Sequence, residues 1–249
     1  MRSPLPAAAT ILVLAGCGGS EADPPAQPRP AAESEDVKAH FTPEAEARER
    51  SRGRFTTARV VRRTTLRAGP AGRVLARIGR QTEFGSPRVL AVTGRRDGWL
   101  RVTASERANG EHGWIRASAA REGSTDVWIR VDRSRRELTL RRGSRVLRRL
   151  PVAVGRPGTE TPLGRFAVTD RLRTRSVDSP YGCCALALSG HQTKLLPGWP
   201  GGDRLAIHAT PNPETVGRPA SLGCMRAHDV DIRVLMRRVP LGAPVVVVA

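Results

Sequence analysis

Short runs of valine, leucine and isoleucine, each soon broken by glycine, proline or a turn dipeptide, dominate this chain from residue 55 onwards. Such runs are typical of strands, because a helix needs a longer segment with a period of 3.6 residues. Aromatic residues make up only 4% of the 249 residues, so aliphatic side chains must build any core. The sequence therefore predicts a mainly β protein.

The N-terminus has the pattern of a secretory signal. A short basic start, Met1 to Pro4, precedes an apolar run from Ala7 to Ala15 that is too short to span a bilayer. The string Leu14-Ala15-Gly16-Cys17 resembles a bacterial lipobox, in which the cysteine becomes the lipidated first residue of the mature protein. We expect a lipoprotein signal peptide at 1–16 and an extracytoplasmic protein, lipid-anchored to the bacterial membrane at Cys17. An ordinary signal peptide with an incidental cysteine is the alternative, and it also exports the protein.

Residues 17–54 differ in composition from the rest of the chain. Proline, alanine, glutamate and serine dominate them, as in the string from Asp23 to Pro30. A segment of this kind cannot bury enough apolar surface to fold. We therefore expect a disordered tether between the anchor and the folded part.

Residues 55–122 are expected to form a small all-β module. Turn signals such as Arg96-Asp97-Gly98 and Asn109-Gly110 separate its apolar stretches. The expected strands lie at 58–61, 74–78, 89–92, 99–102 and 113–115. The runs Thr65 to Pro70, Asp97 to Val102 and Gly113 to Ile115 resemble those of a bacterial SH3-like barrel.

Residues 127–249 are expected to form a second β-rich module. Its strand-like segments lie at 127–131, 137–140 and 146–154, with a last buried strand at 245–248. One helix is expected from Asp229 to Val239, with Asp229 as its cap. The residues expected on its apolar face are Val230, Val234, Leu235 and Val239.

Cys224 is the residue with the clearest chemical signal. It lies in the small-residue string Ser221-Leu222-Gly223-Cys224, and His208 ends an apolar run sixteen positions earlier. A thiol on such a turn and an imidazole on a neighbouring strand can form a thiolate nucleophile and its general base. Arg226 adds an anion-binding group. The adjacent Cys183 and Cys184 are expected to be packing residues.

Other roles for these residues are open to the sequence alone. A single cysteine can be an inert packing residue, and a histidine at a strand end can be a core residue. Cys224, His208 and His228 together could also suggest zinc. The chain lacks the paired Cys-x2-Cys knuckle of a zinc site, so we expect no metal and no other cofactor.

Four ordered motifs in residues 127–249 resemble the YkuD-type L,D-transpeptidase catalytic domain. The segment from Val154 to Phe166 is similar to the family's glycine- and threonine-proline-containing motif, and Tyr181-Gly182 with Leu188 to His191 matches its substrate-facing stretch. Ile207-His208 and the string from Ser221 to Arg226 match the signature histidine and the Ser-x-Gly-Cys-x-Arg motif. The run from Val239 to Val245 resembles the closing turn. The resemblance implies a β-sandwich catalytic domain with a few short helices, next to the small SH3-like β-barrel.

The resemblance also implies roles for individual residues. Cys224 would be the nucleophile, His208 the proton donor and acceptor, and the backbone N–H groups of Gly223 and Cys224 the oxyanion donors. Substrate would be bound by four further residues: Arg226, Ser221, Tyr181 and His191. Arg226 could instead order the loop, and Tyr181 and His191 could equally belong to a structural turn.

Two positions depart from the family pattern. Many members carry a second histidine directly before the Gly-Cys pair, where this chain has Leu222, so His208 is the only plausible base. Ala209 follows His208 and has no hydroxyl, so a backbone carbonyl would have to orient the imidazole.

The implied activity is a peptidoglycan L,D-transpeptidase that cross-links stem peptides through a Cys224 thioester and releases terminal D-alanine. An L,D-carboxypeptidase, with water as the acceptor, and a non-catalytic wall-binding lipoprotein are the alternatives. A papain-like wall peptidase is disfavoured, because those folds place the cysteine before the histidine.

The formal net charge of +19 constrains the partners. Such a surface attracts polyanions, and for an exported protein these are the anionic polymers of the cell wall. Nucleic acid is disfavoured, because aromatic residues are too sparse for base stacking and no nucleic-acid-binding motif is present.

Overall fold

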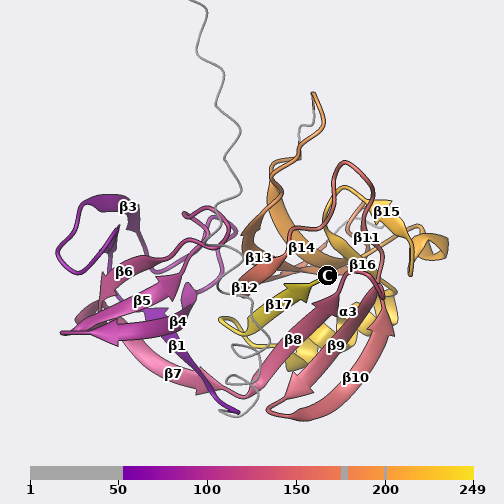
Figure 1. Cartoon of the computed structure of the whole chain (residues 1–249). Helices are drawn as coiled ribbons and strands as arrows, with labels where there is room; N and C mark the ends of the chain where they lie inside the picture. Colours follow the sequence, from indigo (N-terminus) through magenta and orange to yellow (C-terminus); the bar gives the residue numbers. More distant parts are fainter. Residues whose placement is uncertain (1–52, 175–178, 199–200) are drawn as a thin grey trace, which may run out of the picture. The chain divides into compact units, whose positions relative to one another are not determined.

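The computed structural model describes residues 53–174, 179–198 and 201–249 (Figure 1). The predicted signal peptide, the lipidation site at Cys17 and nearly all of the predicted tether lie outside these residues. Strands dominate the described part, which confirms the mainly β fold class. No helix of the described residues is long and apolar enough to cross a membrane.

Among the described residues, 55–125 form a seven-stranded sheet in the order β3-β2-β6-β5-β4-β1-β7, with antiparallel pairing throughout. Its strands are β1 (Phe55–Val60), β2 (Thr64–Arg67), β3 (Val74–Ile78), β4 (Val89–Arg96), β5 (Trp99–Thr103), β6 (Gly113–Arg116) and β7 (Ala120–Thr125). A 3-10 turn at Ala117–Ala119 precedes β7. Asp97 and Gly98, both with positive φ, close the β4–β5 hairpin as the Asp-Gly signal predicts.

This sheet has its own aliphatic core. Leu66, Leu100 and Ile115 are almost completely buried in it, together with residues from β1, β3 and β4. The sequence predicted five of its seven strands and missed β2 and β7, the latter ending three residues beyond the expected module boundary. β7 pairs with β1 along its whole length, yet most of its side chains are polar and exposed, so it has no apolar pattern to detect.

Residues 127–249 form an eight-stranded sheet within the described part, in the order β10-β9-β8-β17-β12-β13-β14-β16. Its strands are β8 (Val127–Asp132), β9 (Glu137–Arg142), β10 (Arg145–Pro151), β12 (Gly164–Arg173), β13 (Cys184–His191), β14 (Arg204–Ala209), β16 (Met225–Ala227) and β17 (Pro244–Val248). Pairing is parallel between β8 and β17 and between β14 and β16, and antiparallel elsewhere.

Short elements complete this module. A parallel pair, β11 (Val154–Gly155) and β15 (Pro219–Ser221), lies beside the sheet, and a 3-10 turn spans Pro213–Thr215. One continuous core joins both ends of the sheet, because residues of β8 and β9 and residues of β13, β14 and β16 belong to the same buried cluster. A sheet that shares one core between its two ends must curve around that core.

The helix α3 (Asp229–Arg238) packs against β13 and β14 of this core. It buries Ile232 and Leu235, whereas Val230 is 63% exposed, so the predicted apolar face was wrong by part of a turn. The N-cap residue is His228, without a side-chain cap bond, and not Asp229. Acidic residues in the first turn and Arg237 and Arg238 in the last turn complement the helix dipole.

The structure corrects one further expectation. Cys183 and Cys184, predicted to be packing thiols, are joined as a disulfide at the start of β13.

Candidate active site

Two neighbouring strands bring Cys224 and His208 to one place. β14 and β16 pair in parallel, with His208 opposite Arg226, and Cys224 directly precedes β16. Cys224, His208 and Arg226 line a depression with a volume of about 200 Å³, together with Ser221 and Tyr181. The structure therefore gathers five of the site residues predicted from the sequence around one cavity.

The turn that carries Cys224 depends on glycine. Gly223 has φ +121°, and a Cβ atom there would lie 2.1 Å from Nε2 of Gln192. Both the backbone conformation and the close neighbour exclude a side chain at this position.

Ser221 and Thr161 fix this turn from inside. The Ser221 hydroxyl accepts a hydrogen bond from Gly223 N–H (3.0 Å) and donates to Cys224 O (2.5 Å). The Thr161 hydroxyl donates to Gly223 O (2.8 Å) and accepts from Gly155 N–H (2.9 Å). The Gly223 N–H, an expected oxyanion donor, is thus already bonded to Ser221, and Ser221 braces the turn as well as lining the cavity.

Cys224 is a partly buried thiol and the only free cysteine among the described residues. Its Sγ lies 3.9 Å from Arg204 O. Burial raises the pKa of the Cys224 thiol, and the backbone of Ala206 and the charge of Arg226 offset part of this effect. At neutral pH the free site therefore holds a thiol, where the sequence suggested a thiolate.

His208 is 5% exposed and held in one tautomer. Its Nδ1–H donates to Ala209 O at 2.5 Å, so a backbone carbonyl orients the ring, as expected from the lack of a hydroxyl at position 209. The lone pair is then on Nε2. Burial lowers the pKa of His208 to about 4, and the positive charge of Arg226 acts in the same direction, while the Ala209 carbonyl opposes both. His208 is a neutral imidazole at neutral pH and can accept a proton at Nε2.

Tyr181 and Arg226 flank this pair. The Tyr181 ring packs edge-on against His208 with 4.9 Å between ring centroids. Arg226 donates from Nη2 to Ala220 O at 2.6 Å, while its buried Nε has no hydrogen-bond partner in the described structure. Arg226 lines the cavity, so its positive charge favours an anionic group there.

His191, also predicted to bind substrate, does not line this cavity. Its Nε2 lies 2.8 Å from Ser105 O of the N-terminal module, and its Nδ1 lies 3.0 Å from Oδ2 of Asp203. The ring bridges two parts of the protein beside the site.

Gln192 is a site residue that the sequence analysis missed. Its buried side chain donates from Nε2 to Thr159 O (3.1 Å), Glu160 O (3.3 Å) and Leu222 O (2.9 Å). The acceptors are backbone carbonyls that leave no trace in the sequence, so only the resemblance around His191 could have drawn attention to this position.

Cys224, His208 and His228, the three residues that together could suggest zinc, do not line one cavity. His228 is the N-cap of α3 and lines a different depression from Cys224 and His208. Among residues 53–174, 179–198 and 201–249, no group of three or more His, Cys, Asp or Glu side chains is arranged to hold a metal ion.

The low pKa of His208 has a measurable effect on stability. A histidine with pKa 6.5 when unfolded and about 4 when folded binds a proton more readily in the unfolded chain, so its contribution to stability is present above pH 6.5 and lost as the pH falls to 4. We expect the wild type to lose about 3 kcal/mol more unfolding free energy between pH 7.5 and pH 4 than His208→Gln. Denaturant titrations of both proteins at the two pH values measure this difference, and equal losses would contradict a buried neutral His208.

Comparison with known proteins finds matches to the C-terminal module, which carries Cys224 and His208. The family model of the YkuD L,D-transpeptidase catalytic domain matches residues 126–247. The chain is 34% identical over 119 residues to the putative L,D-transpeptidase YkuD of Bacillus subtilis, covering 48% of this chain and 64% of that protein. It is 32% identical over 117 residues to the protein of the same name from Bacillus licheniformis, covering 47% and 62%. The chain thus spans a little less than two thirds of the length of these relatives.

Solved structures with a likeness to the chain include an L,D-transpeptidase from Mycobacterium smegmatis, with 16% identity and a TM-score of 0.42 over 65% of this chain and 90% of that one. L,D-transpeptidase 3 from Mycobacterium tuberculosis, in complex with a faropenem-derived adduct, has 20% identity and a TM-score of 0.43 over 64% and 79%.

Proposed function

We propose, from the YkuD L,D-transpeptidase catalytic domain at residues 126–247, that this protein is a peptidoglycan L,D-transpeptidase. The observation that carries the proposal is the pair formed by a turn-borne Cys224 thiol and a neutral His208 in one cavity. Acyl transfer needs a nucleophile, a base and a donor for the oxyanion, and this site offers each of them.

The first half-reaction forms a thioester. Cys224 Sγ attacks the carbonyl of residue three of a donor stem peptide while its proton passes to Nε2 of His208. Because both groups are neutral in the free site, this transfer accompanies the attack and does not precede it. The Cys224 N–H is the oxyanion donor nearest the attacking sulfur, and the Gly223 N–H can join it only by leaving Ser221 Oγ.

Collapse of the tetrahedral adduct breaks the bond to the terminal D-alanine, whose amine takes the proton from His208. In the second half-reaction the side-chain amine of a neighbouring stem attacks the thioester and loses a proton to His208. The C–S bond then breaks, and the departing Cys224 sulfur takes this proton from His208 and becomes a thiol again. The imidazolium that forms twice is stabilised by the Ala209 carbonyl on Nδ1.

Arg226 and Tyr181 are proposed to bind the substrate. The guanidinium of Arg226 lines the cavity and is suited to a stem-peptide carboxylate, because a guanidinium recognises carboxylates through its fixed N–H donors. Tyr181 is 39% exposed and packs on His208, so it can cover the bound peptide on that side of the base.

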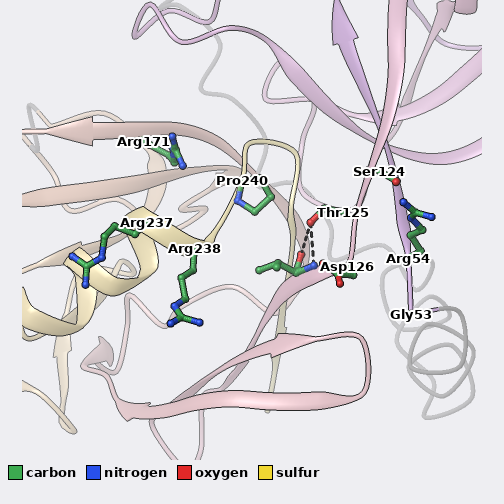
Figure 2. Close-up of a pocket in the computed structure, with 10 residues that line it drawn as sticks. Gly53, Arg54, Ser124, Thr125, Asp126, Arg171, Arg237, Arg238 and Pro240 are labelled. Carbon is green, nitrogen blue, oxygen red and sulfur yellow. Dashed lines mark hydrogen bonds between the residues drawn. The ribbon is translucent and has the colours of Figure 1, made fainter.

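Binding to anionic wall polymers is part of the same proposal. A depression of about 580 Å³ is lined by Arg54, Arg171, Arg237 and Arg238, with Asp126 as its acidic side chain. Figure 2 shows these side chains. Asp126 pairs with Arg142 at 3.6 Å, so the four arginines retain their excess charge. Such a surface attracts phosphate- or carboxylate-bearing polymers. Export and a lipid anchor at Cys17, predicted from the sequence, would hold the enzyme at the wall.

Purified disaccharide tetrapeptides test the activity. We expect cross-linked dimers with loss of one D-alanine per bond, detected by mass spectrometry. Trimmed tripeptides without dimers would instead indicate an L,D-carboxypeptidase, in which water accepts the acyl group. Unchanged substrate, together with full binding to sacculi, would support a non-catalytic wall-binding lipoprotein.

A further inference from the structure

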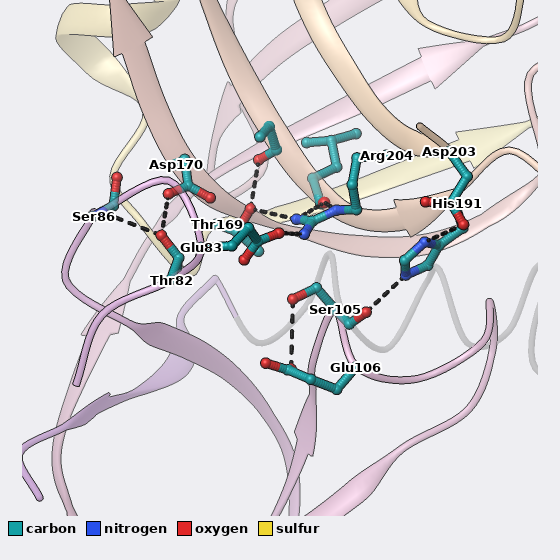
Figure 3. A network of polar contacts seen from close by, with 12 residues as sticks. Thr82, Glu83, Ser86, Ser105, Glu106, Thr169, Asp170, His191, Asp203 and Arg204 are labelled. Carbon is teal, nitrogen blue, oxygen red and sulfur yellow. Dashed lines mark hydrogen bonds and ion pairs between the residues drawn. The ribbon is translucent and has the colours of Figure 1, made fainter. Parts of the chain in front are cut away.

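We propose that the loop joining β5 to β6, residues 104–112 of the N-terminal module, is a positioning element of the Cys224 site that acts through Asn109, His191 and Gln192. Only the turnover measurement below depends on the proposed function, whereas the alkylation measurement does not. Figure 3 shows part of this network, with Ser105 of the loop facing His191 and Asp203.

Asn109 binds the end of β13 as a neighbouring strand would. Its Nδ2 donates to His191 O at 2.7 Å, and its Oδ1 accepts from His191 N–H at 2.8 Å. A side-chain amide that satisfies both backbone groups of one residue fixes the position of that residue in two directions. The loop therefore holds the backbone of His191 directly.

The ring of His191 adds a second attachment. Nε2 lies 2.8 Å from Ser105 O and Nδ1 lies 3.0 Å from the Asp203 carboxylate. Partners on both ring nitrogens hold the imidazole from two sides. Asp203 also accepts from Gln192 N–H through its carbonyl (2.6 Å). His191 thus connects the loop to the start of β14 as well as to the end of β13.

Gln192 carries the connection to the nucleophile. It directly follows the residue that Asn109 holds, and its Nε2 donates to Leu222 O, one residue before Gly223. The same nitrogen binds Thr159 O and Glu160 O across the cavity. Any displacement of the His191 backbone therefore moves the group that fixes the turn of Cys224.

Other contacts fasten the N-terminal module to β12 and β14. Glu83 pairs with Arg204, which also donates to Leu188 O and to the Thr169 hydroxyl (2.9 Å) (Figure 3). Thr82 donates to the fully buried carboxylate of Asp170. These contacts hold β12 and β14 from outside, and Arg204 O also lies 3.9 Å from Cys224 Sγ. The Asn109 path differs in that it leads through Gln192 to the backbone of Leu222, next to Gly223.

The test compares Asn109→Ala with Asn212→Ala, since Asn212 is the only other asparagine in the sequence and its side chain is exposed. Iodoacetamide alkylation of Cys224 is followed from pH 6 to pH 10 in the full chain, well below the unfolding temperature. Loosening the turn lets water reach the thiol, so we expect Asn109→Ala to react about tenfold faster at pH 7.5 and to show a lower midpoint of the pH profile. Asn212→Ala should match the wild type.

Turnover of tetrapeptides gives the second readout. We expect kcat of Asn109→Ala to fall about tenfold with KM nearly unchanged, because the substrate-binding groups remain while the nucleophile is misplaced. Asn109→Asp keeps the acceptor for His191 N–H, so its kcat should lie between those of the wild type and Asn109→Ala. It also serves as the test if the alanine variant does not fold.

A double-mutant cycle identifies the path. If Asn109 acts through Gln192, then Asn109→Ala combined with Gln192→Leu should be no worse than Gln192→Leu alone. Independent, multiplied effects would overturn the proposal, as would an Asn109→Ala protein with a lower melting temperature but a wild-type alkylation profile. Should the wild type show no turnover at all, the proposed function fails, and the alkylation profiles still decide whether the loop positions Cys224.

Discussion

Replacement of Cys224 by alanine is expected to lower the rate of cross-linking by roughly 10⁴ to 10⁶-fold, because no other group of the cavity can form the acyl intermediate. Ser221, the neighbouring hydroxyl, is committed to Gly223 N–H and Cys224 O and points its hydrogen bonds into the turn. We also expect a carbapenem to acylate the wild-type protein and to leave one mass adduct, which Cys224→Ala should abolish. Intact-protein mass spectrometry measures the adduct, and tetrapeptide turnover measures the rate.

Cys183 and Cys184 provide the matched control. Both are joined in a disulfide at the start of β13, so the Cys183→Ala and Cys184→Ala double variant should retain the adduct and the activity. An adduct that persists in Cys224→Ala would place the nucleophile elsewhere and would refute the assignment of the site.

The proximity of Cys224 and His208 could be predicted from the sequence, because the chemistry proposed for them depends on residue type and on order along the chain. Cys224 and His208 follow apolar or small-residue stretches that fold as strands or end at a tight turn, and parallel pairing of β14 with β16 closes the gap between them. Because Ala209 has no hydroxyl, a backbone carbonyl was expected to orient His208, and the carbonyl of Ala209 does so.

The supporting contacts could not be predicted in the same way. Gln192 and Thr161 act on backbone carbonyls and N–H groups, whose positions depend on the fold and not on residue type. His191 was assigned to substrate from its place beside the motif, but its ring is satisfied by Ser105 O and Asp203 instead. A contact between residues 86 positions apart has no local signature in a single sequence.

Strong burial did not decide which strands the apolar patterns revealed, because β12 and β13 are mostly buried and were not predicted, whereas β3 was predicted at its true bounds. β8, with five of six residues buried, was expected within one residue of its true bounds, whereas the polar edge strand β7 was missed. In α3 the apolar residues surround much of the helix, so periodicity alone did not separate the exposed Val230 from the buried Ile232.

His208→Ala is expected to slow acylation of Cys224 by about 10²- to 10⁴-fold, the usual contribution of a positioned general base. The thiol that remains has a raised pKa because of its burial, so little thiolate forms at neutral pH without the imidazole. The rate of the variant should therefore increase as the pH rises toward the thiol pKa, while the wild type, with its base already neutral above pH 4, should depend far less on pH in that range. Acylation rates from pH 6 to pH 10 measure both profiles.

Leu222→His offers a rescue of this variant, because Leu222 lines the same cavity directly before the Gly-Cys pair. A histidine at that position lies on the nucleophile turn itself and can take the proton from the other side of the cavity. We expect His208→Ala with Leu222→His to recover part of the lost rate, and Leu222→His alone to keep activity near that of the wild type. Full activity in His208→Ala would mean that the base is another group. A rescue that fails, with both variants folded, would show that an imidazole is oriented toward the thiol only from β14, where the Ala209 carbonyl holds it.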